Sequence, residues 1–212
     1  MIIISHRGYW KDTNEKNRVE AFVRSFELQL GTETDVRDYN GELVISHDIP
    51  DADCLSFRKM LHLYKKHATE RPPLALNVKS DGLQVQVKRT LSEEGIDNYF
   101  FFDMSVPDML GYFSAGLKTF VRVSEYETLN SLYEQADGVW LDGFKDDLVT
   151  EAFLEKVIND GKRICIVSPD LHKRPYKNVW EKYKSFDSAI LSSNNLIICT
   201  DYPEECVEFF ND

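Results

Sequence analysis

The sequence predicts an α/β protein built as a compact (β/α)8 TIM barrel, in a single domain over residues 1–212. Short apolar runs of strand length alternate with amphipathic stretches of helix length along the chain. About eight such pairs fit into 212 residues, the count of a small (β/α)8 barrel. An open, doubly wound sheet is the alternative, but it would usually need fewer strands, and no GxGxxG turn follows the first strand.

The first half of the chain alternates between expected strands and helices. A strand over 2–5 precedes a helix over 17–30, whose apolar residues fall on one stripe. A hairpin over 31–48 turns at Asn40-Gly41, a dipeptide that readily takes positive φ. The elements expected next are a helix over 57–66, a strand over 74–78, a helix over 83–94, a strand over 99–102 and a helix over 106–114.

The second half continues the alternation. The expected elements are a strand over 119–123, a short helical piece over 127–134, a strand over 138–141, a helix over 147–159, a strand over 163–167, a helix over 176–185, a strand over 196–199 and a helix over 204–210. Because the carboxyl ends of barrel strands form the working face, polar residues at those ends should cluster there.

Polar side chains do stand at the ends of many expected strands. They are His6, Arg7, Glu33, Asp35, His47, Asn77, Lys79, Asp103, Asp142 and Asp201. Glu33 and Asp35 are two residues apart in a strand, so both carboxylates leave the same face and favour a bound cation. Asp201, just before Tyr202-Pro203, could instead be a helix N-cap with no other role.

Composition excludes several classes of partner. The formal net charge is -11, and no dense block of lysine and arginine provides the basic face that a nucleic acid or an anionic membrane would need. The cluster His172-Lys173-Arg174 with Lys177 is too short for that and is typical of a solvated loop. No apolar run approaches the ~20 residues that span a bilayer, so no stable membrane insertion is expected.

The cysteines and the N-terminus predict a cytoplasmic protein. Cys54, Cys165, Cys199 and Cys206 show no metal-binding spacing and are expected to be buried or free thiols. The residues after Met1 do not form the basic, apolar and cleavage regions of a signal peptide. Export without a cleaved signal is compatible with this sequence.

Five short motifs carry a family resemblance. HRG at 6–8, ETDV at 33–36, HD at 47–48, LNVK at 76–79 and TDYP at 200–203 follow one another along the chain. Together they resemble the glycerophosphodiester phosphodiesterase family, part of the phospholipase C-like superfamily of TIM barrels, and the resemblance covers nearly the whole chain. It implies hydrolysis of a phosphodiester and a divalent cation, Mg²⁺ or Ca²⁺, with Mn²⁺ as a further option.

The resemblance also implies residue roles. His6 and His47 would be the general acid and base, Arg7 and Lys79 would contact phosphate oxygens, and Glu33, Asp35 and Asn77 would hold the metal. General chemistry agrees, because a cation, a guanidinium and an ammonium together neutralise charge that develops on phosphate oxygens. Imidazoles titrate near neutrality and can move protons, and oxygen ligands select a hard cation over zinc.

Three departures from the family pattern bear on the site. Asn77 stands where the family has a glutamate, so metal affinity should fall, unless Asp103 compensates. Lys16-Asn17-Arg18 stands where the family has Glu-Asn-Thr, with Glu15 one place early. The family's insertion between its HD motif and its third strand is missing. This predicts a site that is open to solvent and has fewer residues to contact a glycerol group.

Two further features are open to more than one interpretation. The polar segment SPDLHKRP over 168–175 follows the seventh expected strand, where barrels often hold phosphate. We expect it to bind a saccharide or head-group part of the substrate, and a plain exposed loop is the alternative. Trp10 would either stack on substrate or cap the barrel.

The sequence thus predicts a metal-dependent phosphodiesterase that acts on a small glycerophosphodiester-like or glycan-linked substrate. One alternative is a phosphate-binding barrel that has lost turnover. Another is a relative that cleaves lipid head groups, as sphingomyelinase D-like enzymes do, although such an enzyme would be expected to show apolar loops. A PHP-type metallohydrolase is disfavoured because the first strand has no HxH pair. Nothing in the chain encodes the exact substrate or the oligomeric state.

Overall fold

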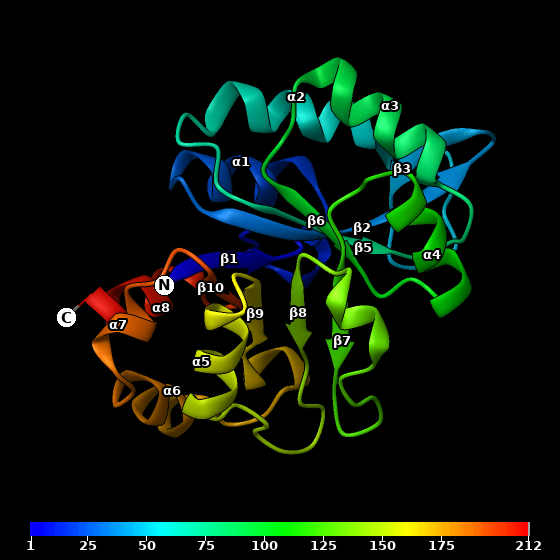
Figure 1. Cartoon of the computed structure of the whole chain (residues 1–212). Coiled ribbons are helices and arrows are strands. Elements are labelled where there is room, and N and C mark those ends of the chain that lie inside the picture. Colours follow the sequence, from blue (N-terminus) through cyan, green and yellow to red (C-terminus); the bar gives the residue numbers. More distant parts are fainter. Residues whose placement is uncertain (212) are drawn as a thin grey trace. The chain divides into compact units, whose positions relative to one another are not determined.

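Figure 1 shows the computed structural model of the chain, which describes residues 1–211. Contacts within the chain divide it into two compact units. The N-terminal unit is residues 5–119, and the C-terminal unit combines residues 1–4 with the segment from residue 120 onward. The first strand, β1 (Ile2–His6), begins in the C-terminal unit and ends in the N-terminal one.

The sheet of the N-terminal unit has parallel strands at its centre. The strand β2 (Gly31–Tyr39) pairs in parallel with β5 (Leu74–Val78), which pairs in parallel with β6 (Tyr99–Phe102). On the other side, β3 (Glu42–Ile45) runs antiparallel to β2, and β4 (Leu55–Ser56) runs antiparallel to β3. The turn between β2 and β3 has positive φ at Asn40 and Gly41, so the predicted hairpin is confirmed.

Aromatic side chains contribute to the packing of the helices in this unit. The helices are α1 (Val19–Glu27), α2 (Phe57–His67), α3 (Gln84–Glu94) and α4 (Val106–Ser114), with a 3-10 turn η1 (Thr13–Glu15) before α1. Phe26 of α1 meets Tyr64 of α2 edge to face, with ring centroids 5.3 Å apart, and both side chains are buried. This contact joins α1, which follows the Arg7 turn, to the core.

The C-terminal unit repeats the alternation of strand and helix. Its parallel strands lie in the order β10 (Leu196–Thr200), β9 (Arg163–Val167), β8 (Gly138–Leu141) and β7 (Phe120–Val123). Its helices are α5 (Glu151–Asn159), α6 (Lys177–Lys184), α7 (Ser188–Leu191) and α8 (Pro203–Asn211), with 3-10 turns η2 (Ser131–Glu134) and η3 (Pro169–His172). Strands β9 and β10 are almost wholly buried, as expected of parallel strands.

The predicted α/β class and its parallel strands are confirmed, and the differences have local causes. The helix α1 begins at Val19 rather than residue 17, because Asn17 has a φ of 60° that no right-handed helix accepts. The helix α5 begins at Glu151 because Thr150 caps its N-terminus. Only the 3-10 turn η2 forms within 127–134. Phe101 of β6 forms a single parallel bridge with Thr119, and residues 1–211 contain no ladder that closes a complete barrel.

The structure also bears on the cysteines and on the length of the helices. All four cysteines are free thiols, three of them buried, as predicted. Among the residues that the structure describes, no helix has the length and apolar character needed to cross a bilayer.

Candidate functional site

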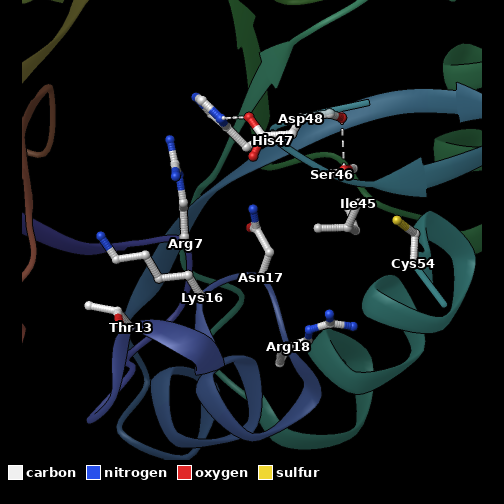
Figure 2. Close-up of a pocket in the computed structure, with 10 residues that line it drawn as sticks. All are labelled: Arg7, Thr13, Lys16, Asn17, Arg18, Ile45, Ser46, His47, Asp48 and Cys54. Atoms are coloured by element: carbon white, nitrogen blue, oxygen red, sulfur yellow. Dashed lines mark hydrogen bonds and ion pairs between the residues drawn. The ribbon is translucent and has the colours of Figure 1, made fainter. Parts of the chain in front are cut away.

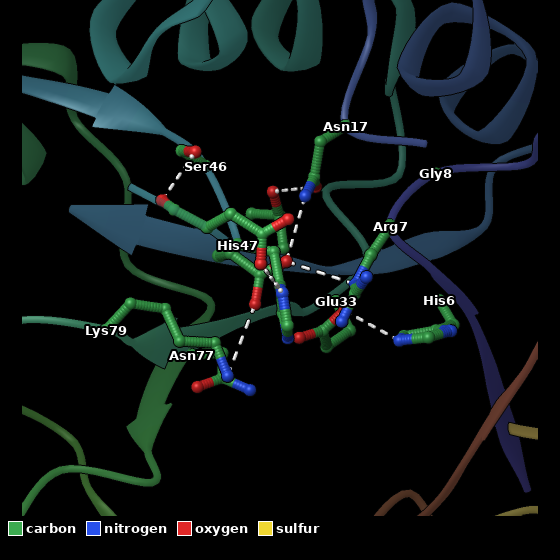
Figure 3. A network of polar contacts seen from close by, with 12 residues as sticks. His6, Arg7, Gly8, Asn17, Glu33, Ser46, His47, Asn77 and Lys79 are labelled. Carbon is green, nitrogen blue, oxygen red and sulfur yellow. Dashed lines mark hydrogen bonds and ion pairs between the residues drawn. The ribbon is translucent and has the colours of Figure 1, made fainter. Parts of the chain in front are cut away.

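The paired strands β2 and β5 set out a polar face inside the N-terminal unit (Figure 3). Side chains two residues apart on a strand share a face, which places Glu33 with Asp35 and Asn77 with Lys79. In the strand register, Asp35 is directly opposite Asn77. The pairing of the two strands therefore places Asp35 and Asn77 next to each other on this face.

Arg7 reaches this face from a strained turn after β1. Arg7 and Gly8 have φ values of 58° and 79°, both in the left-handed region. A Cβ on Gly8 would lie 2.7 Å from Ala21 Cβ, so only glycine fits against α1 there. The Arg7 N–H donates to the Glu33 carbonyl at 2.9 Å, and this bond fixes the turn against β2.

Asp35 is the centre of charge on this face. Its side chain is fully buried, and the Arg7 Nε lies 3.1 Å from its Oδ2 while the Lys79 Nζ lies 3.5 Å from its Oδ1. The Asn17 amide also donates to Oδ2 at 2.8 Å and accepts from the Thr34 hydroxyl at 2.8 Å. Two cations and one amide thus surround this buried carboxylate and compensate its removal from water.

The carboxyl group of Glu33 is also buried, but fewer close partners compensate the cost of its burial than at Asp35. Desolvation raises the pKa of the Glu33 carboxyl well above its ordinary value, and repulsion from Asp35 raises it further. The His6 Nε2 lies 3.8 Å from Glu33 Oε2, beyond hydrogen-bonding distance. A carboxyl group in this setting gains charge when a cation approaches it.

Three buried oxygens on this face accept no hydrogen bond. They are Glu33 Oε2, Asp35 Oδ1 and Asn77 Oδ1. The Asn77 Nδ2 donates to Asp103 Oδ2 at 3.1 Å, and because a carboxylate only accepts, this bond turns the amide oxygen away from Asp103. Unsatisfied buried oxygens cost about 1–3 kcal/mol each, and oxygen donors of this kind are the ligands of Mg²⁺ and Ca²⁺.

The donor set therefore fits a hard divalent cation, with one charge fewer than three carboxylates would bring. Within residues 1–211, no group of three or more histidine, cysteine, aspartate or glutamate side chains is placed to hold a metal ion. This agrees with the residues present, because the third donor of the face is the neutral amide of Asn77.

His47 lies in a neighbouring pocket of about 270 Å³ (Figure 2). Arg7 and Asn17 line both the pocket and the polar face, so the two are continuous. The His47 Nδ1 lies 2.9 Å from the Asp48 carboxylate, and 44% of the imidazole side chain is exposed. If Nδ1 carries the proton donated to Asp48, Nε2 is left to exchange a proton with a ligand.

Two residues hold the site in ways that the sequence did not indicate. Asn17 was noted only because residues 16–18 depart from the family pattern, yet its amide bridges Thr34 and Asp35. Asp103 was considered as a source of the charge that Asn77 lacks, and in the structure it accepts the hydrogen bond that orients the Asn77 amide. Both have positive φ, which asparagine and aspartate tolerate best, and this preference is the one signal that could have drawn attention to them.

Polar strand ends in the C-terminal unit are bonded to each other. The His172 Nε2 lies 2.6 Å from Asp142 Oδ1. Arg174 donates to the carbonyls of Gly143 at 2.6 Å and Asp146 at 3.2 Å. One carboxylate oxygen of Asp170 accepts from Thr200 and from the Asp201 N–H. In the segment 168–175, His172 and Arg174 thus make contacts with neighbouring parts of the chain.

Comparison with known proteins identifies relatives by structure alone. No protein-family model matches the sequence, and no curated protein sequence matches it either. Solved structures do match over almost the whole chain. A glycerophosphodiester phosphodiesterase from Parabacteroides distasonis has a TM-score of 0.71 at 16% identity, covering 99% of this chain and 96% of its own.

Two other structures extend the comparison. A glycerophosphodiester phosphodiesterase from Agrobacterium tumefaciens has a TM-score of 0.69 at 16% identity, with 100% of both chains covered. A Ca²⁺-dependent phosphatidylinositol-specific phospholipase C from Streptomyces antibioticus has a TM-score of 0.54 at 8% identity, covering 99% of this chain and 95% of its own. The chain therefore shares the fold of these solved structures.

Proposed function

We propose that this chain is a metal-dependent phosphodiesterase that hydrolyses a glycerophosphodiester-like substrate. The observation that carries the proposal is the face of β2 and β5, where three buried oxygens without hydrogen bonds stand beside two cations. The fold shared with glycerophosphodiester phosphodiesterases supports the same activity.

Arg7 and Lys79 would bind the phosphodiester anion. Both side chains are mostly buried and face Asp35, so water does not fully screen their charge. The guanidinium offers paired N–H groups to two phosphate oxygens, and the ammonium adds a point charge. This pair would hold the phosphate and stabilise the negative charge that grows on its oxygens during attack.

His6 and His47 would share the proton transfers. One imidazole takes the proton from the attacking hydroxyl, of water or of the substrate, as its oxygen bonds to phosphorus. The other gives a proton to the leaving alkoxide as its bond to phosphorus breaks. The Asp48 carboxylate is hydrogen bonded to the His47 Nδ1 and would hold the imidazole in one orientation.

Glu33, Asp35 and Asn77 would hold the cation through the oxygens named above, with Mg²⁺, Ca²⁺ or Mn²⁺ as the metal. Such an ion, when bound, neutralises charge on phosphate oxygens and lowers the pKa of a bound hydroxyl.

The test is hydrolysis of bis(p-nitrophenyl) phosphate and a panel of glycerophosphodiesters, with Ca²⁺, Mg²⁺, Mn²⁺ or chelator. We expect cation-dependent turnover that His6→Ala lowers by about 10³-fold or more, because an acid–base group contributes that much. His62→Ala is the matched control, because His62 is exposed on α2 and contacts Glu94 outside the site. Absence of turnover with every cation, from folded protein, would overturn the proposal.

A second candidate function is phosphate binding without turnover. The observation that favours it is the neutral Asn77, which leaves two carboxylates on the face. Such a protein would bind inorganic phosphate equally well with cation or chelator. The diesterase would instead bind phosphate more tightly when the cation is present, so calorimetry under both conditions separates the two functions.

A further inference from the structure

The helices α5 and α7 lie side by side in the C-terminal unit (Figure 1), and a groove of about 460 Å³ lies between them. Five lining residues come from α5 and three from α7 and its N-cap: Glu151, Ala152, Glu155, Ile158, Asn159, Asp187, Ala189 and Ile190. The volume is within the ≈ 300–1,000 Å³ of typical ligand sites. None of these residues belongs to the candidate site described above, so the groove is a separate feature of the molecule.

The α5 side of the groove is one stripe of the helix surface. Glu151, Glu155 and Ile158 follow one another at spacings of four and three residues, so their side chains leave the same face of the helix. Leu154 and Val157, on the neighbouring stripe, are fully buried and join α5 to the core. The groove side of α5 is therefore not needed to pack the core, and it is available to a ligand.

The floor of the groove is apolar. Ile158 is half-buried and Ile190 is 8% exposed, while Ala152 and Ala189 are exposed. Because an alanine side chain is a single methyl group, the two alanines leave room in the groove for an incoming side chain. An apolar side chain that enters there removes its own surface and that of the isoleucines from water, which favours binding.

Hydrogen bonds hold the two sides of the groove together. Glu151 Oε1 accepts from the Asp187 N–H at 2.5 Å, and this bond ties the start of α7 to the start of α5. Asp187 Oδ1 accepts from the Ala189 N–H at 2.7 Å and caps α7, as Thr150 caps α5. The groove is therefore preformed, so a ligand does not have to order it on binding.

The rim of the groove is negatively charged. Three carboxylates line it, those of Glu151, Glu155 and Asp187, and no lysine, arginine or histidine is among the lining residues. The nearest ammonium on α5, that of Lys156, is paired with Asp160 at 2.6 Å. In the part of the chain that the structure describes, no cation forms an ion pair with these three carboxylates. The groove thus combines an apolar floor with uncompensated negative charge.

From these observations we infer that the groove between α5 and α7 is a docking site for a basic amphipathic segment of a protein partner. An apolar side chain of the segment fills the floor, and lysines or arginines beside it place their charged heads at the carboxylates of the rim. Charge complementarity selects this occupant, because an acidic segment is repelled by the same rim. The inference goes beyond the proposed diesterase function and does not depend on it.

The mixed lining distinguishes this occupant from simpler cations. An aliphatic polyamine offers charge to the rim but no branched side chain to the floor, so it leaves Ile158 and Ile190 in contact with water. A peptide segment offers both kinds of group at once, and its backbone stays outside the groove while its anchor side chains enter.

The test compares two synthetic peptides by calorimetry at one ionic strength. The first is an amphipathic peptide of about 12 residues, with leucines on one helical face and lysines on both sides of them. The second keeps the lysines and has alanines in place of the leucines. We expect saturable binding of the leucine peptide, about 10-fold tighter than that of the alanine peptide, because the leucines fill the apolar floor. Equal affinities would show that charge alone attracts the peptide, which contradicts the inference.

Variants assign the binding to the groove. Ala189→Trp fills the groove without a change of charge, and Glu151→Gln with Glu155→Gln removes two charges but keeps an oxygen that accepts hydrogen bonds. Each should weaken binding of the leucine peptide by about 10-fold or more. The control is Glu181→Gln with Glu208→Gln, which removes two charges from exposed positions on α6 and α8 and should change the affinity by no more than about 2-fold. Wild-type affinity in either folded groove variant would overturn the inference.

Other occupants of the groove give different results. Spermidine that binds as tightly as the leucine peptide and displaces it would assign the groove to a polyamine and refute the inference. Self-association of the wild type that Ala189→Trp abolishes, measured by sedimentation velocity, would assign it to a second copy of this chain and also refute the inference. Should Ala189→Trp fail to fold, Ala152→Leu fills the groove from α5 and takes its place in both measurements. Each of these results leaves the proposed diesterase function unchanged, because peptide binding does not require turnover.

Discussion

The two units treat the polar residues at their strand ends in different ways. In the C-terminal unit, Asp142 is bonded to His172, and Arg174 is bonded to the carbonyls of its own loop. In the N-terminal unit, Glu33, Asp35 and Asn77 keep buried oxygens without hydrogen bonds. At the strand ends of the C-terminal unit, the described residues contain one such oxygen, Oδ1 of Asp170.

This difference separates stabilising polar groups from reactive ones. In a bonded pair such as Asp142 with His172, each side chain already has a hydrogen-bond partner, so no ligand is needed to supply one. Three unsatisfied oxygens on one face represent a cost to folding that a bound cation can offset. Polar residues at equivalent places in a sequence pattern thus have opposite roles, and hydrogen-bond satisfaction distinguishes them.

The largest expected effect is a difference in kcat/KM between the variants Asp35→Asn and Asp142→Asn. Asp35→Asn removes the charge that positions Arg7 and Lys79 and one donor of the cation site, so kcat/KM for a diester should fall about 10³-fold. The matched change at Asp142, in the C-terminal unit, should alter kcat/KM by no more than about 3-fold, because its partner is the nearby His172. Equal losses in both variants, with both proteins folded by circular dichroism, would remove the distinction between the units.

The next effect is on the pH dependence of stability. Burial and Asp35 raise the pKa of Glu33 above its unfolded value of 4.5. The protonated carboxyl is therefore favoured by folding, and its contribution is complete below pH 4.5 and is lost as the pH rises through the folded pKa. Without cation, we expect the protein to lose roughly 1–3 kcal/mol between acid and mildly alkaline pH.

Glu33→Gln tests this pH dependence by urea unfolding in chelator. The variant should flatten the loss of stability at rising pH, because glutamine does not ionise. Addition of Ca²⁺ to the wild type should also oppose the loss, since a cation stabilises the charged carboxylate. A wild-type curve that already lacks the loss would show that Glu33 stays charged in the folded protein.

A smaller effect, on the affinity for Ca²⁺, is expected at Asn77, the neutral member of the candidate cation site. Asn77→Glu adds a third carboxylate, but it also removes the bond to Asp103 and brings two negative charges together. We expect the single variant to gain little affinity for Ca²⁺, and Asn77→Glu with Asp103→Asn to gain about 10-fold by calorimetry. A full gain in the single variant would show that Asp103 does not position residue 77.

The smallest expected effect on catalysis is at Arg174. Its guanidinium holds the carbonyls of Gly143 and Asp146, so Arg174→Ala should lower the free energy of unfolding by about 1–2 kcal/mol. The KM for the diester should change by no more than about 2-fold. A KM that rises 10-fold would instead support the prediction that segment 168–175 binds a substrate head group.

Much of the fold follows from local sequence rules. The Asn40-Gly41 turn fixes the β2–β3 hairpin, and Gly95 ends α3 in a left-handed conformation, both as predicted. Segment 127–134 forms only a 3-10 turn, and the short α7 was missed, because brief helices have little periodicity to detect. Strand register was beyond local rules, since it depends on how distant strands pair.

Sequence geometry could place some residues of the candidate site on one face, but it could not predict how they are bonded. Residues two apart on one strand share a face by geometry, so Glu33 with Asp35 could be paired from sequence. That Asp35 is opposite Asn77 depends on the β2–β5 register, and that Asn17 bridges Thr34 and Asp35 depends on a left-handed residue before α1. The hydrogen bonds that separate Asp142 from Asp35 are tertiary, and no pattern in the chain encodes them.

The close approach of Gly8 to Ala21 couples a buried helix position to the turn that holds Arg7. A Cβ on Gly8 would lie 2.7 Å from Ala21 Cβ, and the Tyr9 N–H donates to the Ala21 carbonyl at 2.9 Å. Any enlargement at position 21 would push on the turn that aims Arg7. Substitutions at position 21 should therefore change the placement of Arg7 without altering any polar group of the candidate site.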